Sequence, residues 1–154
     1  MLTGAILCFV CTIDTRASLI QKNLSGYWDG LGTLIQNSEH LIPCEQSEIW
    51  INETFNTIEF SDAIFKCRPH SFDFHSLVLE LRGTELFLDD QKVGTYDQSC
   101  LKFYTGLPGN SWSLNLCKQQ DSISYQDRLE ALGSTYEIQA QFQRSSVLAK
   151  EARK

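Results

Sequence analysis

The side chains most able to carry acid–base chemistry are carboxylates spread along strand-like segments of the sequence. Six lie on or near such segments: Glu48, Glu59, Asp62, Glu80, Glu85 and Asp127. General acid–base catalysis needs two groups held together at a substrate, and no spacing here places any two of them in that way. Glu80 and Glu85 are expected to oppose each other across a hairpin at residues 82–83, as outward, solvated carboxylates. No serine lies in a Gly-x-Ser-x-Gly motif, so we predict no catalytic residue.

The histidines are the remaining candidates for metal or haem chemistry. His75 alternates along one predicted strand face with Leu77, Leu79 and Leu81. A neutral imidazole on an apolar inner face could ligate haem iron, although a core histidine bonded to a backbone carbonyl is the more common arrangement. His40 and His70 fall in loops and are expected at the surface. We predict no metal site and no cofactor.

Four cysteines follow an apolar leader, and their spacing predicts two disulfides. Opposed residues of an antiparallel hairpin have a constant index sum, which centres Cys100 and Cys117 on the turn-like residues 106–110. The same argument centres Cys44 and Cys67 on residues 52–57, with one weak point, Asp62 opposite Ile49, that suggests a bulge or a slipped register. We therefore predict the pairs 44–67 and 100–117. A zinc site of four thiols is the rival, but the short CxxC spacing typical of such sites is missing.

The leader itself and the overall charge indicate a compartment. Residues 2–13 are apolar and almost uncharged, have the length of a signal-peptide core and are too short to span a bilayer. Small residues then favour cleavage after Ala17; the alternative is a buried first element of a cytosolic protein. The net charge of −6, with basic residues clustered only at the C-terminus, argues against nucleic acid. We predict a secreted or periplasmic protein with no membrane span and a monomeric state.

After the leader the sequence reads as short strands joined by tight turns, with no strong helix. Period-2 alternation and turn residues predict ten of them: 26–35, 43–53, 57–67, 74–81, 84–89, 92–97, 100–105, 111–118, 122–130 and 134–144. Short connections favour antiparallel neighbours, and closing the first strand onto the last removes both exposed edges. The sequence therefore predicts an all-β, up-and-down barrel over residues 18–144, preceded by a signal peptide (1–17) and followed by a tail (145–154).

The predicted closure brings together Trp28, at the start of the first strand, and Arg144, at the end of the last. With an even number of antiparallel strands these two ends share a rim. Arg144 also has the parity of the inward residues Tyr136, Ile138, Ala140 and Phe142, so its guanidinium can cover the indole face. Arg128 has the opposite parity to its inward neighbours and is expected to point outward. Gly30 and Gly32 let the strand bend or another backbone approach.

These residues resemble a known superfamily. Gly26-Tyr27-Trp28 resembles the Gly-x-Trp motif that begins the first strand of lipocalins, and Arg144 resembles the arginine that packs over that tryptophan in the calycin superfamily. The wider Trp28-x-Gly30-x-Gly32 is similar also to the start of nitrobindin-like and fatty-acid-binding-like barrels of ten strands. The resemblance implies a cup for a small apolar molecule, walled by the residues that we expect to face inward: His75, Leu77, Leu79, Tyr136 and Ile138.

Three functions are compatible with this architecture. The first is a lipocalin-like module that binds a small apolar molecule. The second is a haem-binding or enzymatic protein on the same barrel. The third is a structural or interaction protein whose barrel is filled by its own phenylalanine and leucine side chains. Fold analogy favours the first.

Overall fold

The computed structural model describes residues 23–97 and 99–145, and among them it contains eleven antiparallel strands and no helix. The strands are β1 (Gly26–Gln36), β2 (His40–Cys44), β3 (Gln46–Glu53), β4 (Thr57–Cys67), β5 (His70–Arg82), β6 (Glu85–Leu88), β7 (Gln91–Asp97), β8 (Cys100–Leu107), β9 (Asn110–Gln119), β10 (Ser122–Ala131) and β11 (Ser134–Arg144). The predicted signal peptide and all of the predicted tail except Ser145 lie outside the described residues. Within the described ranges, no helix is long and apolar enough to cross a membrane.

The strands form one closed antiparallel barrel. From β3 to β11 each strand pairs with the next, and β1 pairs with β11 on one edge and with β2 and β3 on the other. Only Glu45 separates β2 from β3, so these two strands lie end to end along β1 and together occupy one position in the barrel. The predicted all-β, up-and-down barrel of about ten strands is confirmed, with one strand more than predicted because of this break.

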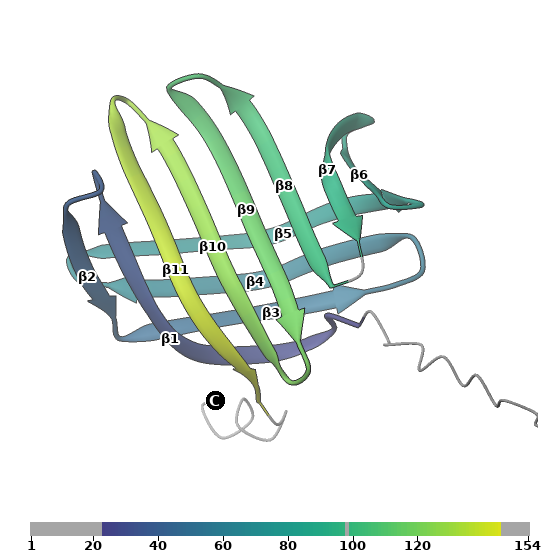
Figure 1. Cartoon of the computed structure of the whole chain (residues 1–154), viewed down its shortest axis with the longest axis horizontal. Helices are drawn as coiled ribbons and strands as arrows, with labels where there is room; N and C mark the ends of the chain where they lie inside the picture. Colours follow the sequence, from purple (N-terminus) through teal and green to yellow (C-terminus); the bar gives the residue numbers. More distant parts are fainter. Residues whose placement is uncertain (1–22, 98, 146–154) are drawn as a thin grey trace, which may run out of the picture.

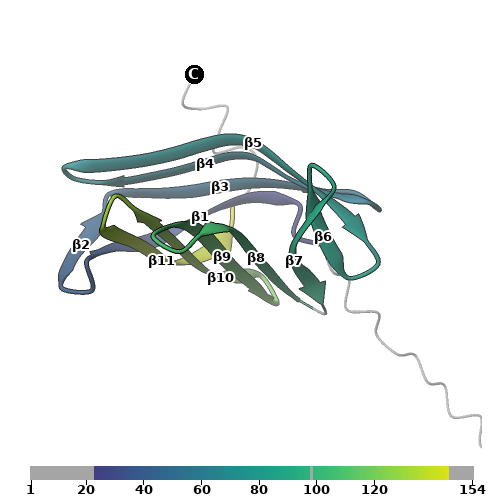
Figure 2. The ribbon, with the colours of Figure 1, turned by 90° about the horizontal axis from the view of Figure 1, so that it is seen from above.

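The barrel is flattened into two layers. Figure 1 shows β3, β4 and β5 running across one layer while β8 to β11 cross them in the other, and Figure 2 shows the two layers edge-on. The long strand β1 passes from one layer to the other along one side, and β6 and β7 connect the layers at the opposite side. This geometry places the inner faces of the two layers against each other as a single core.

The core is rich in aromatic side chains contributed by both layers. Phe65 of β4 packs on Tyr125 and Phe142, with ring centroids 5.1 and 6.2 Å away, and all three side chains are buried. Each such ring contributes about 1.5–3 kcal/mol through burial alone. The inward alternation predicted for the last strand is confirmed at Ile138, Ala140 and Phe142. These side chains fill the middle of the barrel and join its two layers.

The predicted contact between the first and last strands closes one end of the barrel. Trp28 and Arg144 are register partners, and the Arg144 guanidinium carbon lies 4.8 Å from the centre of the indole ring. Trp28 is fully buried and its indole N–H donates to the Leu24 carbonyl at 2.8 Å. Arg128 is exposed on the outer face, as predicted, and bonds to Glu130.

Gly30 has the role expected of it, because another backbone lies against its Cα. A Cβ at this position would lie 1.9 Å from the carbonyl oxygen of Gln141 on the paired strand. Any side chain would therefore push β1 and β11 apart where the barrel closes.

Both predicted disulfides are present. Cys100 is bonded to Cys117, in the predicted register that also sets Leu101 against Leu116 and Phe103 against Leu114. Cys44 is bonded to Cys67. The expected bulge between β3 and β4 is a register shift at Trp50 and Ile51, which puts Asp62 opposite Trp50 instead of Ile49.

His75 does not face the interior, and that prediction is wrong. The ladder between β4 and β5 is interrupted at Ser61 and Ser76, and Ser76 has a left-handed φ of 57°. Alternation changes phase at this point, so Phe72 and Phe74 face inward before it and Leu77 and Leu79 after it. The His75 side chain is 63% exposed, and its Nδ1 lies 2.9 Å from Asp62 Oδ1. The haem hypothesis built on an inward His75 therefore loses its iron ligand.

Candidate ligand cavity

A cavity of about 340 Å³ lies between the layers at the end of the barrel away from Trp28. It is lined by nine residues from four strands: Ser71, Phe72, Asp73, Phe74, Trp112, Asp127, Leu129, Tyr136 and Ile138. Tyr136 pairs with Gln36, at the opposite end of the β1–β11 ladder from the pair of Trp28 and Arg144. Eight residues of strand, about 27 Å, separate Tyr136 from Arg144. One end of the barrel is therefore plugged, and the other holds the cavity.

Four of the nine lining residues are aromatic, and they come from both layers. Phe74 of β5 packs edge-on against Trp112 of β9, with centroids 5.6 Å apart, and Trp112 also packs on Phe103 at 4.8 Å. Phe72 lies 5.8 Å from Tyr136 of β11. These contacts fix the rings against one another, so the wall is formed before any ligand arrives. The volume is at the lower end of the range of about 300–1,000 Å³ usual for small-molecule sites.

One wall position carries a carboxylate. Asp127 follows Ile123 and Tyr125 at spacings of two along β10, so it faces inward with them. Its Oδ1 accepts a hydrogen bond of 2.5 Å from the Trp112 indole N–H, and its Oδ2 accepts one of 3.1 Å from the Tyr125 hydroxyl. Both donors are neutral groups.

The surroundings of Asp127 change its acidity. The residue keeps some accessible surface toward the cavity, but protein atoms surround its carboxyl group on nearly all sides. This desolvation raises the pKa of Asp127 from 3.8 to about 6, and the hydrogen bonds from Trp112 and Tyr125 offset part of the effect. Burial, with the nearby Asp127 charge, also raises the pKa of Tyr125 well above its usual value, so this hydroxyl remains a donor at neutral pH.

Asp127 is the carboxylate that faces the cavity, and none of the nine lining residues is lysine, arginine or histidine. Asp73 also borders the cavity, but it alternates with the inward Phe72 and Phe74 and is exposed, so its side chain points outward. His70 stacks on Phe72 and meets Tyr136 edge-on, with centroids 6.2 and 5.9 Å away, so its ring borders the aromatic wall without lining the cavity.

Only some of the residues predicted to bind a ligand lie at this cavity. Tyr136 and Ile138 line it. Leu79 is fully buried in the core, Leu77 packs against that core, and neither lines the cavity. His75 lies outside the barrel.

Sequence reasoning missed four important wall residues: Phe72, Phe74, Trp112 and Asp127. For Asp127 the signal was present, because the alternation of Ile123, Tyr125 and Leu129 includes its position. For the two phenylalanines it was hidden by the change of phase at Ser76.

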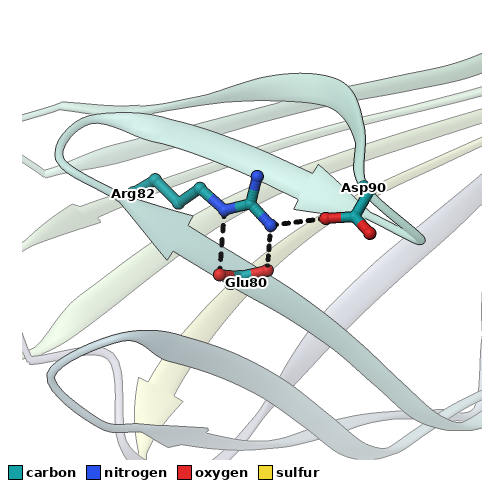
Figure 3. A network of polar contacts seen from close by, with 3 residues as sticks. All are labelled: Glu80, Arg82 and Asp90. Atoms are coloured by element: carbon teal, nitrogen blue, oxygen red, sulfur yellow. Dashed lines mark hydrogen bonds and ion pairs between the residues drawn. The ribbon is translucent and has the colours of Figure 1, made fainter.

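None of the other five carboxylates named from the sequence lines the cavity. Figure 3 shows Arg82 donating from Nε and Nη2 to Glu80, at 2.8 and 2.7 Å, and from Nη2 to Asp90 at 2.6 Å. The Arg82 hydrogen bond lowers the pKa of Glu80. The expected pairing of Glu80 with Glu85 is wrong, because the register sets Glu80 against Phe87 and Arg82 against Glu85. This network joins the end of β5 to the β6–β7 turn.

A second hollow lies on the outer face of the barrel. It has a volume of about 1020 Å³ and is a broad, open groove over β1 and β8 to β11, lined largely by outward uncharged side chains that include Leu31, Asn115, Gln126, Gln139 and Gln141. It has neither an aromatic wall nor an inward polar anchor. The smaller inner cavity is therefore the better candidate for a small-molecule site.

Metal chemistry has no evident place in the part of the chain that the structure describes. No group of three or more histidine, cysteine, aspartate or glutamate side chains there could hold a metal ion.

Comparisons with protein-family models and with curated proteins found no match to the sequence. Function therefore has to be argued from the barrel and its cavity.

Proposed function

We propose that this protein is a lipocalin-like binding module that holds a small, largely apolar molecule in the cavity at the open end of its barrel. The observation that carries the proposal is the preformed aromatic wall of Phe72, Phe74, Trp112 and Tyr136 around about 340 Å³. Burial of a ligand's apolar surface against such rings provides the affinity, and the few polar wall groups provide orientation. The plug of Trp28 and Arg144 at the other end is consistent with calycin membership.

The cavity also distinguishes this proposal from the two alternatives. A barrel completely filled by its own side chains would have no such volume, and the large buried rings of Phe65, Tyr125 and Phe142 fill only the middle of the barrel. A haem protein would need an inward iron ligand, and His75 points outward. Ligand binding is the function that uses the features present.

Secretion or export to a periplasm fits the covalent structure. Two disulfides, Cys44–Cys67 and Cys100–Cys117, are typical of proteins that mature in an oxidising compartment. The apolar residues 2–13, followed by the predicted cleavage after Ala17, would be the export signal. We therefore place the binding function outside the cytoplasm.

Binding of the neutral fluorescent probe N-phenyl-1-naphthylamine to the oxidised protein tests the proposal. We expect saturable fluorescence enhancement at one site per chain. Leu129→Trp adds bulk to the cavity wall and should weaken binding at least tenfold, whereas the matched variant Val78→Trp, at an exposed position of β5, should leave it unchanged. Equal effects of the two variants, or no saturable binding, would refute the proposal.

A further inference from the structure

The environment of Asp127 indicates the charge of the ligand. No lysine, arginine or histidine of the described residues pairs with this carboxylate, and its hydrogen bonds come from the neutral groups of Trp112 and Tyr125. A buried carboxylate without a counter-ion is costly, and such groups are normally paired. The missing partner is therefore a positive charge, and the cavity is the direction from which it can arrive.

The geometry leaves room for one more donor. Each carboxylate oxygen accepts about two hydrogen bonds, and each oxygen of Asp127 receives one from the protein: Oδ1 from Trp112 and Oδ2 from Tyr125. Because Asp127 lines the cavity, the remaining acceptor sites are available to a molecule inside it. Trp112 and Tyr125 also fix the carboxylate in place, so a ligand need not order it.

The aromatic wall favours the same class of ligand. A cation is attracted to the faces of Trp, Tyr and Phe rings within about 6 Å, and more strongly where water is excluded. Phe72, Phe74, Trp112 and Tyr136 contribute their rings to the cavity in which Asp127 lies. One carboxylate surrounded by aromatic rings is suited to an ammonium group attached to an apolar body.

The same charges disfavour anions. A fatty acid or another carboxylate ligand would bring its negative charge into a cavity that holds the Asp127 carboxylate and is lined by no basic residue. Like charges at close range are repulsive, and they are least screened where water is excluded. The net charge of −6 adds to this preference, because it attracts cations from solution.

We propose that the cavity binds an organic cation, a primary or secondary amine with an aromatic or aliphatic body, whose ammonium group pairs with Asp127 while its body lies against the aromatic wall. This inference rests on the proposed function and specifies its ligand. A purely structural role for Asp127 is the alternative: the carboxylate would then serve only to accept the hydrogen bonds of Trp112 and Tyr125.

Three indole compounds that differ in charge separate these roles. Tryptamine carries an ammonium group, 3-ethylindole is neutral and indole-3-propionate is an anion, while the apolar bodies match. Displacement of N-phenyl-1-naphthylamine from the oxidised full chain at pH 7.4 gives their relative affinities. We expect tryptamine to bind at least tenfold more tightly than 3-ethylindole, in line with a charge-assisted hydrogen bond, and the anion to bind most weakly.

Two amide variants locate the charge. Asp127→Asn keeps the size and an acceptor for the Trp112 N–H, and it should reduce the preference for tryptamine over 3-ethylindole to less than threefold without weakening the neutral compound. Asp73→Asn removes the carboxylate of the outward-facing residue between Phe72 and Phe74 and should keep most of the preference. Retention of the full preference in Asp127→Asn, or an equal loss in Asp73→Asn, would assign the charge effect elsewhere and overturn the inference.

The pH profile provides a second readout. Below about pH 6 Asp127 is protonated, so tryptamine affinity should fall as the pH is lowered while 3-ethylindole affinity stays constant. The other titratable groups around the cavity are Asp73 and His70 on β5 and the hydroxyls of Tyr125 on β10 and Tyr136 on β11. Any pH dependence caused by these groups persists in Asp127→Asn, and only the difference between the two profiles belongs to Asp127.

The outcomes also distinguish this inference from the proposed function. If N-phenyl-1-naphthylamine binds in the cavity but tryptamine and 3-ethylindole bind equally, the inference fails and the binding function stands. If the neutral probe does not bind at all, both fail.

Discussion

Replacing Asp127 by asparagine should stabilise the ligand-free protein at neutral pH. Burial raises the pKa of Asp127, so the folded protein holds this proton more tightly than the unfolded chain does. Ionisation of the group therefore opposes folding: the penalty is absent below about pH 4, grows between pH 4 and 6, and is complete above pH 6. Asparagine has no charge to desolvate and still accepts the hydrogen bond from Trp112.

The size of the stabilisation follows from the pKa shift of Asp127. The pKa rises from 3.8 to about 6, and each unit corresponds to about 1.4 kcal/mol, so the ionised carboxylate costs about 3 kcal/mol. In asparagine an amide nitrogen replaces the oxygen that accepts the hydrogen bond from the Tyr125 hydroxyl. The loss of this hydrogen bond offsets part of the stabilisation. We expect Asp127→Asn to raise the free energy of unfolding by about 2 kcal/mol at pH 7 and to change it little at pH 4.

Urea denaturation of both proteins at half-unit steps from pH 4 to pH 8 measures this difference. Other carboxylates contribute equally to the two curves, so the subtraction isolates Asp127. A difference that is constant across the range, or a variant less stable than the wild type at pH 7, would mean that Asp127 is not ionised at a cost in the folded state. A stabilised variant that has lost its preference for amines would show that the protein gives up stability to keep this charge.

Three further predictions concern the barrel itself. Trp28→Ala should lower the free energy of unfolding, measured by urea denaturation, by about 3–5 kcal/mol, and Arg144→Ala should lower it by about 1 kcal/mol. Because the guanidinium lies over the ring, the double variant should show a coupling energy of about 0.5–1 kcal/mol between the two positions. Removal of one disulfide by Cys100→Ala and Cys117→Ala should lower the unfolding free energy by about 3 kcal/mol, since the bond constrains the unfolded chain over a sequence separation of 17. Gly30→Ala should cost about 3 kcal/mol or more, seen as a lower melting temperature, because its Cβ would collide with the opposite strand.

Each of these has a matched control. Arg128→Ala removes an exposed, outward arginine and should change stability by less than about 0.5 kcal/mol; a larger loss than for Arg144→Ala contradicts the closing contact. The disulfide variant should match the wild type measured with that bond reduced, and a difference points to the substitutions themselves. Gly83→Ala meets no atom within 4 Å but has a φ of 68°, so it should cost only about 1 kcal/mol, and a cost equal to that of Gly30→Ala would argue against a collision.

Barrel closure and both disulfides could be predicted because they depend on index sums and parity, which a sequence displays directly. The positions of Cys100 and Cys117 fix a register along one regular hairpin, and that register is observed from Cys100 to Leu107. The pairing of Trp28 with Arg144 needed only an even number of strands and the inward parity of β11. Regular ladders carry this information without distortion.

Irregular ladders change the index sum or the parity along the strand, and the wrong predictions arise at two such places. The interruption at Ser61 and Ser76 reverses which residues of β4 and β5 face inward. The residue types in that segment do not predict the interruption, because serine rarely adopts a left-handed conformation. His75 was therefore assigned to the wrong face. The turn after Arg82 was also placed one pair out of register, which produced the incorrect pairing of Glu80 with Glu85.

The cavity depended on the three-dimensional arrangement. Its wall joins β5 of one layer to β9, β10 and β11 of the other, and contacts between layers leave no pattern in the sequence. Asp127 could have been placed inward by parity alone, but its partner Trp112 lies on a different strand.

The seam between β1 and β11 has a consequence for how the chain folds. Arg144 donates to the Asn23 carbonyl across a separation of 121 residues, so this closing contact joins parts of the sequence that are made far apart in time. Contacts between residues so far apart in the sequence form late in folding. The chain loses the entropy of the long loop before the contact contributes any stabilising energy. Hairpins from β3 to β10 can form while one edge of β1 is still unpaired, because β11 is the last strand of the chain. Until β11 pairs with it, that edge of β1 is open to pairing with a strand of another chain.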